Sequence, residues 1–151
     1  MYTNGMQRRI AVRGIVILDG KLLCMRLKPY RHADAGTYWS TPGGGVDNGQ
    51  ALVPALEREM IEETGIHPKV GRLLFIQQYA SKNEEQLEFF FQIDNPKDYL
   101  NIDLSKTSHG QTEIEEYGFI DPSTKRVLPD FLQTTNFDEA SLSATRIFNY
   151  L

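Results

Sequence analysis

Short runs of alternating apolar and polar residues recur along much of the chain, and such alternation is typical of β-strands. Residues 9–18 are rich in β-branched side chains and form the first predicted strand. Asp19-Gly20 then supplies the tight turn of a hairpin that returns through residues 21–27. Further strands are predicted over residues 70–80, 87–93 and 114–120.

The pattern predicts its clearest helix over residues 51–64, where apolar side chains recur at helical spacing. The side chains expected to share its apolar side are Leu52, Val53, Leu56 and Met60. Pro54 is compatible with the first turn, and Gly65 occupies the position of a C-terminal cap. Two shorter helices are expected near the C-terminus, over residues 129–132 and 138–150.

The segments between these elements are predicted to be loops. They cover residues 28–36, the polar stretch 95–111, and Pro42-Gly43-Gly44-Gly45, which we expect to be irregular. The predicted strand over 87–93 contains Phe89, Phe90 and Phe91 in succession, so both of its faces should be buried. Interspersed strands and helices indicate a mixed sheet with helices on its faces, an α/β (α+β) class, in a single domain spanning residues 1–151.

The net charge, the cysteine count and the distribution of apolar residues limit the kinds of partner and location that the chain can have. The chain has 151 residues and a net charge of −4, which disfavours a nucleic-acid coat or an anionic membrane surface. A small anionic substrate fits if a cation bridges it to the protein. The single cysteine, Cys24, excludes an internal disulfide, and we expect it to be buried on a strand. No apolar run approaches the roughly 20 residues of a membrane span, and residues 1–9 are polar, so a cytoplasmic location is expected.

Three carboxylates mark the candidate chemistry. Glu59, Glu62 and Glu63 stand at positions i, i+3 and i+4 of the predicted helix, within an arc of about 100°. Like charges on one face repel each other, and they crowd the end of the helix where the macrodipole disfavours negative charge. A divalent cation over this face would relieve the repulsion, and an all-oxygen set suits Mg²⁺ or Mn²⁺.

A glycine run precedes this helix. Gly43, Gly44 and Gly45 allow the backbone to approach a ligand closely, and a carbonyl group from this run, such as that of Gly43, could add a metal ligand.

Together these residues resemble the Nudix box, a pattern of Gly, five residues, Glu, seven residues, then Arg-Glu-apolar-any-Glu-Glu-any-Gly-apolar. Gly44 opens the pattern, and the run from Arg58 to Ile66 closes it at the expected distance. The resemblance extends from about residue 9 to residue 120. It implies an α/β/α sandwich with a mixed β-sheet. It also implies a hydrolase that cuts a pyrophosphate bond in a nucleoside diphosphate linked to another moiety, with Mg²⁺ or Mn²⁺ as cofactor.

The resemblance also implies roles for individual residues. Glu59 and Glu63 are the first choice as metal ligands, with Glu62 as a coupled third, and Glu59 could instead bind the nucleophilic water. Arg58 would orient the glutamates. Residues expected to meet the substrate are Gly44, Gly45 and Arg31, together with Lys28 and His32 as further candidates for phosphate contacts. An additional acidic ligand could come from Glu113, Glu115 or Glu116, and the sequence does not choose among them.

One position departs from the pattern, because Gln50 stands where the box has its first glutamate. Gln50 can accept a hydrogen bond from Arg58, but a neutral acceptor makes a weaker bond than a carboxylate. This leaves open a second reading, a catalytically weak or inactive Nudix-like module that binds a nucleotide. An isopentenyl-diphosphate isomerase would need a cysteine near the box, which Cys24 does not provide. The identity of the substrate and a possible homodimer stay open.

Overall fold

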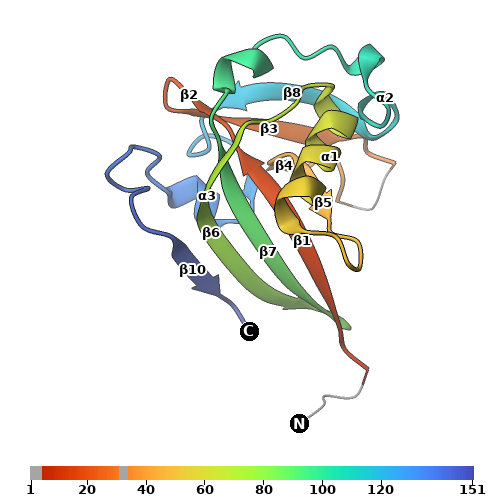
Figure 1. The fold of residues 1–151 in the computed structure, drawn as a ribbon, viewed down its shortest axis with the longest axis vertical. Coiled ribbons are helices and arrows are strands. Elements are labelled where there is room, and N and C mark those ends of the chain that lie inside the picture. The colour runs from red at the N-terminus through yellow and green to blue at the C-terminus, as the bar shows by residue number, and fades with distance from the viewer. Residues whose placement is uncertain (1–4, 31–33) are drawn as a thin grey trace.

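The computed structural model describes residues 5–30 and 34–151, and their strands form two mixed sheets beside one long helix (Figure 1). The first sheet has the strand order β10-β6-β7-β1-β5. Its strands are β1 (Gln7–Ile15), β5 (Gly43–Gly45), β6 (Val70–Ser81), β7 (Glu84–Ile93) and β10 (Arg146–Asn149). The pairs β1–β7 and β10–β6 are parallel and the others are antiparallel, which confirms the mixed α+β class.

The second sheet runs in the order β2-β3-β4-β9, and β8 pairs with the other edge of β3. Its strands are β2 (Ile17–Leu18), β3 (Lys21–Leu27), β4 (Trp39–Ser40), β8 (Ile114–Ile120) and β9 (Val127–Leu128). The first predicted strand is therefore divided between the two sheets at Val16. The predicted hairpin follows it, with Asp19 and Gly20 at φ 51° and 75°, the two positive values that a tight two-residue turn requires.

The helix α1 (Leu52–Thr64) ends at the predicted residue, where Gly65 adopts φ 73° and its N–H donates to the Ile61 carbonyl. Leu56 and Met60 are fully buried, whereas Val53 is 36% exposed and does not belong to the apolar side expected for it. No helix in the described ranges is long and apolar enough to cross a membrane.

Two hydrophobic clusters lie on opposite sides of the sheets, and alternate strand residues join one or the other. Phe90 belongs to the cluster that contains Phe75 and Phe131, while Phe91 belongs to the cluster that contains Leu56 and Met60 of α1. The three consecutive phenylalanines thus contribute to both sides of β7, as the sequence predicts. The first cluster is covered by α3 (Phe131–Thr134) and by Phe148 of β10.

The predictions for the glycine run and for residues 138–150 were wrong. The glycine run was expected to be irregular, but Gly43–Gly45 forms β5 along the free edge of β1. A Cβ on Gly43 would come within 2.0 Å of the Val12 carbonyl oxygen, so glycine is what permits this pairing. Residues 138–150 were expected to be a helix, but they form turns followed by β10, which pairs with the outer edge of β6. The backbone hydrogen bonds that β6 offers at its edge override the local helical pattern.

The polar stretch 95–111 contains three short helical turns rather than extended loop. They are η1 (Pro96–Tyr99), η2 (Leu104–Lys106) and the start of α2 (Gly110–Glu113). The N–H of His109 donates to the carbonyl of Glu62, so this segment is anchored to the C-terminal half of α1. The shorter predicted helix over 129–132 appears two residues later as α3.

Candidate active site

The predicted carboxylates lie where the C-terminal half of α1 packs against β5 (Figure 1). Glu63 is 6% exposed, and its Oε2 accepts hydrogen bonds from the Gly43 N–H at 3.3 Å and from the Tyr117 hydroxyl at 3.1 Å. Glu59 lies against Gly44 so closely that a Cβ on that glycine would be 2.5 Å from the carboxylate. The glycine run therefore serves the site through its lack of side chains as well as through its backbone groups.

Arg58 holds the outer part of this face. Its Nη1 donates to Glu59 Oε1 at 2.9 Å and to Glu62 Oε2 at 3.3 Å. Its Nη2 lies 3.3 Å from the Gly45 carbonyl oxygen and 3.4 Å from Gln50 Oε1. The contact expected between Gln50 and Arg58 is thus present, and it is long. Arg58 is positioned to orient two of the three glutamates.

Glu62 has a second neighbour besides Arg58, a histidine from the polar stretch after β7. His109 Nδ1 lies 3.1 Å from Glu62 Oε2. The adjacent Gly110 sits tightly against α1, since a Cβ there would be 2.6 Å from the Glu63 carbonyl oxygen. His109 therefore belongs to the surroundings of the site.

Burial and mutual repulsion change the acidity of this face. Burial raises the pKa of Glu63 to about 8, with Glu59 adding to the rise, while Arg13 and the two hydrogen bonds oppose it. Burial, reinforced by Glu62, also raises the pKa of Glu59 despite the adjacent Arg58. Burial and the neighbouring Glu63 raise the pKa of Tyr117 well above its ordinary value. Such strongly shifted groups are concentrated at functional sites.

The donor set fits a hard divalent cation, because it consists of carboxylate oxygens beside backbone groups. The carboxylates do not form a ready three-ligand cluster within residues 5–30 and 34–151. The reason is physical: Glu59 and Glu62 turn toward Arg58, and Glu63 turns toward Gly43 and Tyr117. The residues that fit the cation best are Glu59 and Glu63, which flank the glycine run.

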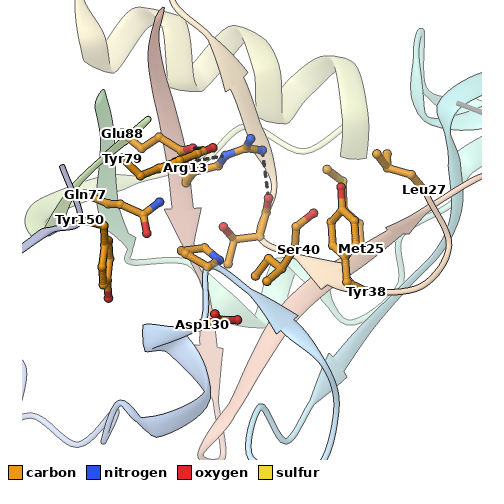
Figure 2. A pocket seen from close by; sticks show the side chains of 13 residues that line it. Arg13, Met25, Leu27, Tyr38, Ser40, Gln77, Tyr79, Glu88, Asp130 and Tyr150 are labelled. Atoms are coloured by element: carbon orange, nitrogen blue, oxygen red, sulfur yellow. Dashed lines mark hydrogen bonds and ion pairs between the residues drawn. The ribbon is translucent and has the colours of Figure 1, made fainter. Parts of the chain in front are cut away.

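A cavity of about 400 Å³ lies beside this face (Figure 2). None of the three box glutamates lines it. Figure 2 shows Arg13, Tyr79 and Glu88 grouped on one side, with Met25, Leu27 and Tyr38 on the other. Arg13 Nε lies 3.4 Å from Glu88 Oε2, and the Tyr79 hydroxyl donates to Glu88 Oε1 at 3.1 Å.

The polar residues that line this cavity were not identified from the sequence. Glu88 stands between Leu87 and Phe89 of β7, and a charged residue inside a buried strand was the available signal. Arg13 interrupts the apolar part of β1 in the same way. Tyr117 on β8 gave no comparable signal, because tyrosine is common in strands.

The remaining candidates have other neighbours or are exposed. Glu116 pairs with Arg26 at 2.7 Å, Glu115 is exposed, and the Glu113 carbonyl accepts from the Lys28 N–H. The Lys28 ammonium donates to the Gln111 carbonyl at 2.7 Å. Arg31 and His32 lie outside the described residues. Cys24 is buried on β3, as predicted, and burial raises the pKa of its thiol.

A profile of the NUDIX domain matches residues 7–140, which include the glycine run, all of α1 and every described strand except β10. The chain belongs to the NUDIX family. An ADP-ribose pyrophosphatase from Methanocaldococcus jannaschii is 36% identical over 78 residues, which cover 50% of this chain and 42% of the relative. An RNA pyrophosphohydrolase from Bartonella clarridgeiae is 29% identical over 105 residues, covering 66% of this chain and 54% of the relative. The matches thus span about half the length of these curated relatives.

Solved structures agree on the fold. The crystal structure of a MutT protein from Methanosarcina mazei Go1 superposes with a TM-score of 0.69 at 21% identity, covering 87% of this chain and 92% of the other. This similarity confirms the expected NUDIX architecture.

Proposed function

We propose that this NUDIX chain is a hydrolase that cuts a pyrophosphate bond in a nucleoside diphosphate linked to another moiety, using Mg²⁺ or Mn²⁺. The observation that carries the proposal is the junction between α1 and β5, where Glu59 and Glu63 flank Gly43 and Gly44. The two acidic side chains lie directly against the glycine backbone, and carboxylate oxygens are the ligands that a hard divalent cation prefers. The printed names of both curated relatives, a pyrophosphatase and a pyrophosphohydrolase, support this class of reaction.

Glu59 and Glu63 are the proposed principal ligands, with Glu62 and the Gly43 carbonyl as further oxygen donors. The cation would neutralise the diphosphate and lower the pKa of a coordinated water. Arg58 would keep Glu59 and Glu62 oriented through the two hydrogen bonds from its Nη1. Gly44 and Gly45 would admit the diphosphate close to the backbone. Positioning and charge stabilisation supply most of the catalysis expected for phosphate chemistry of this kind.

The test is a substrate panel with Mg²⁺ and, separately, Mn²⁺, followed by chromatography of the products. The panel contains nucleoside triphosphates, nucleotide sugars, ADP-ribose, dinucleoside polyphosphates and a 5′-triphosphorylated RNA. The RNA checks the expectation from the net charge of −4 that nucleic acid is not a partner. We expect cleavage of at least one small compound that requires metal.

Two variants of α1 provide the controls. Glu63→Gln keeps the size of the side chain and removes its charge, and we expect turnover to fall at least a hundredfold. Glu57→Gln changes a more exposed glutamate of the same helix, whose carboxylate lies 3.5 Å from His67, and should leave turnover within about twofold. Full activity in Glu63→Gln would contradict the assigned metal site.

The alternative, a NUDIX-like module that binds a nucleotide without turnover, is favoured by the 3.4 Å contact between Gln50 and Arg58. A neutral and distant acceptor holds the arginine less firmly than a carboxylate would. Tight binding of a panel compound with no cleavage by the wild-type chain, followed by cleavage in Gln50→Glu, would show that this position silences the site. We expect the protein to act on free nucleotides in the cytoplasm, and a homodimer remains a prediction.

A further inference from the structure

Two residues connect the cavity with the face of α1 that carries Glu59, Glu62 and Glu63, which is called the glutamate face from here on. Tyr117 lies between them, with its hydroxyl 3.1 Å from Glu63 Oε2 and 3.5 Å from the Sδ of Met25, which lines the cavity. Arg13 also lines the cavity, and its positive charge interacts favourably with Glu63. A ligand that engages the glutamate face can therefore extend into the cavity past Arg13.

Arg13 is fixed by two contacts, which use only part of the hydrogen-bond donors of its guanidinium group. Its Nε faces Glu88 at 3.4 Å, and its Nη1 donates to the Thr41 carbonyl at 3.4 Å. Its Nη2 makes no hydrogen bond to the residues that the structure describes. Burial opposes the positive charge, but Glu88 and Glu63 outweigh burial and raise the pKa of the guanidinium, so Arg13 stays charged. Figure 2 shows the side chain fixed by its two dashed contacts at one side of the cavity.

A second ion pair between β1 and β7 shows that these two strands can be joined without burying the charges. Arg8 of β1 pairs with Glu85 of β7 at 2.8 Å, and its side chain is 57% exposed. The pair of Arg13 and Glu88 is mostly buried, at 20% and 6% exposure, and its contact is longer. Burying an ion pair adds little stability compared with apolar side chains. The buried pair therefore calls for an explanation other than strand association.

The wall around Arg13 is polar, whereas the neighbouring part of the same sheet face, with Phe75 and Phe90, is apolar. Gln77 and Glu88 are 4% and 5% exposed, and they lie opposite each other on β6 and β7. The Thr41 hydroxyl is buried beside the cavity and has no hydrogen-bond partner in the described part of the chain. Buried polar groups without protein partners are typical of places where a ligand or water completes the hydrogen bonding.

We propose that Arg13 is a substrate-binding residue, whose Nη2 holds a phosphate oxygen at the boundary between the glutamate face and the cavity. The moiety beyond that phosphate enters the cavity and carries no phosphate of its own. Asp130 adds a negative charge there, and no cationic side chain other than Arg13 belongs to the described lining. The proposal rests on the proposed function for the identity of the diphosphate, and it adds which residue receives the substrate and what class of group follows.

Equilibrium binding tests this without requiring turnover. Dissociation constants for ADP-ribose and for the four common nucleoside triphosphates are measured by calorimetry with Ca²⁺ in place of Mg²⁺ or Mn²⁺, after chromatography has shown that no product forms during the titration. The proteins compared are the wild type, Arg13→Gln, Arg13→Lys, Glu88→Gln and Arg8→Gln. A hydrogen bond to a charged group contributes about 1.5–3 kcal/mol, so Arg13→Gln should weaken binding of the tightest compound about 10- to 150-fold. Arg13→Lys keeps the charge and should recover part of the loss, although it lacks the planar fork.

The other two variants separate binding from structure. Arg8→Gln, the matched control on the same strand, should change binding less than twofold. Glu88→Gln removes the counter-charge but leaves Arg13 in place, so phosphate binding should be equal or tighter even though the protein melts at a lower temperature. A purely structural pair would make Arg13→Gln and Glu88→Gln act alike.

Two results would overturn the proposal: unchanged affinity in Arg13→Gln, or equal losses in Arg13→Gln and Glu88→Gln. Binding of Mn²⁺ alone, which reports the glutamate face, should stay within twofold of wild type in Arg13→Gln. Failure of the proposed function would show differently, as wild-type binding with no metal-dependent cleavage of any panel compound.

Discussion

Replacing Gly44 by alanine tests the site at the point where the structure is tightest. The new Cβ would lie 2.5 Å from Cδ and Oε2 of Glu59, whereas ordinary contact begins at 3.4 Å. The carboxylate must therefore move by about 0.9 Å, the difference between these two distances. Because the obstacle is the end of a flexible side chain and Gly44 has no positive φ, the backbone has no reason to shift.

The magnitude follows from the role proposed for Glu59. A misplacement of about 1 Å in a positioned group can reduce the rate about a hundredfold. We expect kcat/KM on the best panel compound to fall by about that factor and Mn²⁺ binding to weaken. The thermal midpoint should stay within about 4 °C of the wild type, a change that corresponds to roughly 1 kcal/mol at this chain length.

The adjacent glycine supplies the control. A Cβ on Gly45 would meet its nearest atom, in the Arg9 guanidinium, at 3.4 Å, so Gly45→Ala leaves Glu59 in place and can act only through the approach of the diphosphate to the backbone. Its loss of activity should therefore be smaller than that of Gly44→Ala. Full activity in Gly44→Ala would refute the reasoning that Glu59 must occupy its present position. Equal losses in both variants would show instead that the backbone of β5, and not the Glu59 carboxylate, is what the substitutions disturb.

Three other predictions concern Glu63, Gln50 and Phe131. Because burial raises the pKa of Glu63 to about 8, the folded protein holds this proton more tightly than the unfolded chain. The free energy of unfolding of the metal-free protein should therefore decline from about pH 4.5 to about pH 8. Mg²⁺ binding at pH 7 should release about one proton, which calorimetry in buffers of different ionisation enthalpy measures. Absence of proton release, or release that persists in Glu63→Gln, would contradict this prediction. Gln50→Glu gives Arg58 a charged partner in place of the 3.4 Å contact with the Gln50 amide oxygen. It should raise kcat/KM up to about fivefold, the equivalent of roughly 1 kcal/mol. A decrease would show that the added charge competes with Glu59 and Glu62 for the arginine. Phe131→Ala removes a ring whose centroid lies 4.0 Å from that of Phe148 and 5.3 Å from that of Phe75, and should lower the free energy of unfolding by about 3–5 kcal/mol in urea titrations; Mn²⁺ binding by the folded fraction should not change.

The parts of the molecule that the sequence predicts well are those specified by short-range pattern. The hairpin turn at Asp19-Gly20 and the end of α1 at Gly65 each depend on backbone conformations that their residues favour. The spacing of Glu59, Glu62 and Glu63 places them on one helix face wherever that helix packs. Family membership, which the domain profile confirms, rests on the same contiguous stretch.

The parts that the sequence predicts poorly depend on partners distant in the chain. Residues 146–149 become a strand because β6 presents an open edge about 70 positions earlier, and nothing within those four residues specifies that edge. The glycine run likewise becomes β5 because β1 is available beside it. Such tertiary pairings override local propensity.

The cavity is the extreme case, since its walls come from both sheets and from residues as far apart as Arg13 and Tyr150. The residue pattern of β6 and β7 nevertheless indicates the position of the cavity. On β6 the positions of Phe75, Gln77 and Tyr79 point to one face, and on β7 those of Phe90, Glu88 and Gln86 point to the same face. Going outward from the core, each strand changes from phenylalanine to a polar side chain, and Gln77, Glu88 and Gln86 remain buried after the change. A solvent-facing strand end would also turn polar, so the sequence alone does not separate the two cases. Register and burial separate them, because polar groups that stay buried on paired strands must face one another or a ligand. Under the proposed function, the change from apolar to polar residues along β6 and β7 would mark the part of the site that recognises the substrate, whereas the glutamate face would mark where the diphosphate is cut.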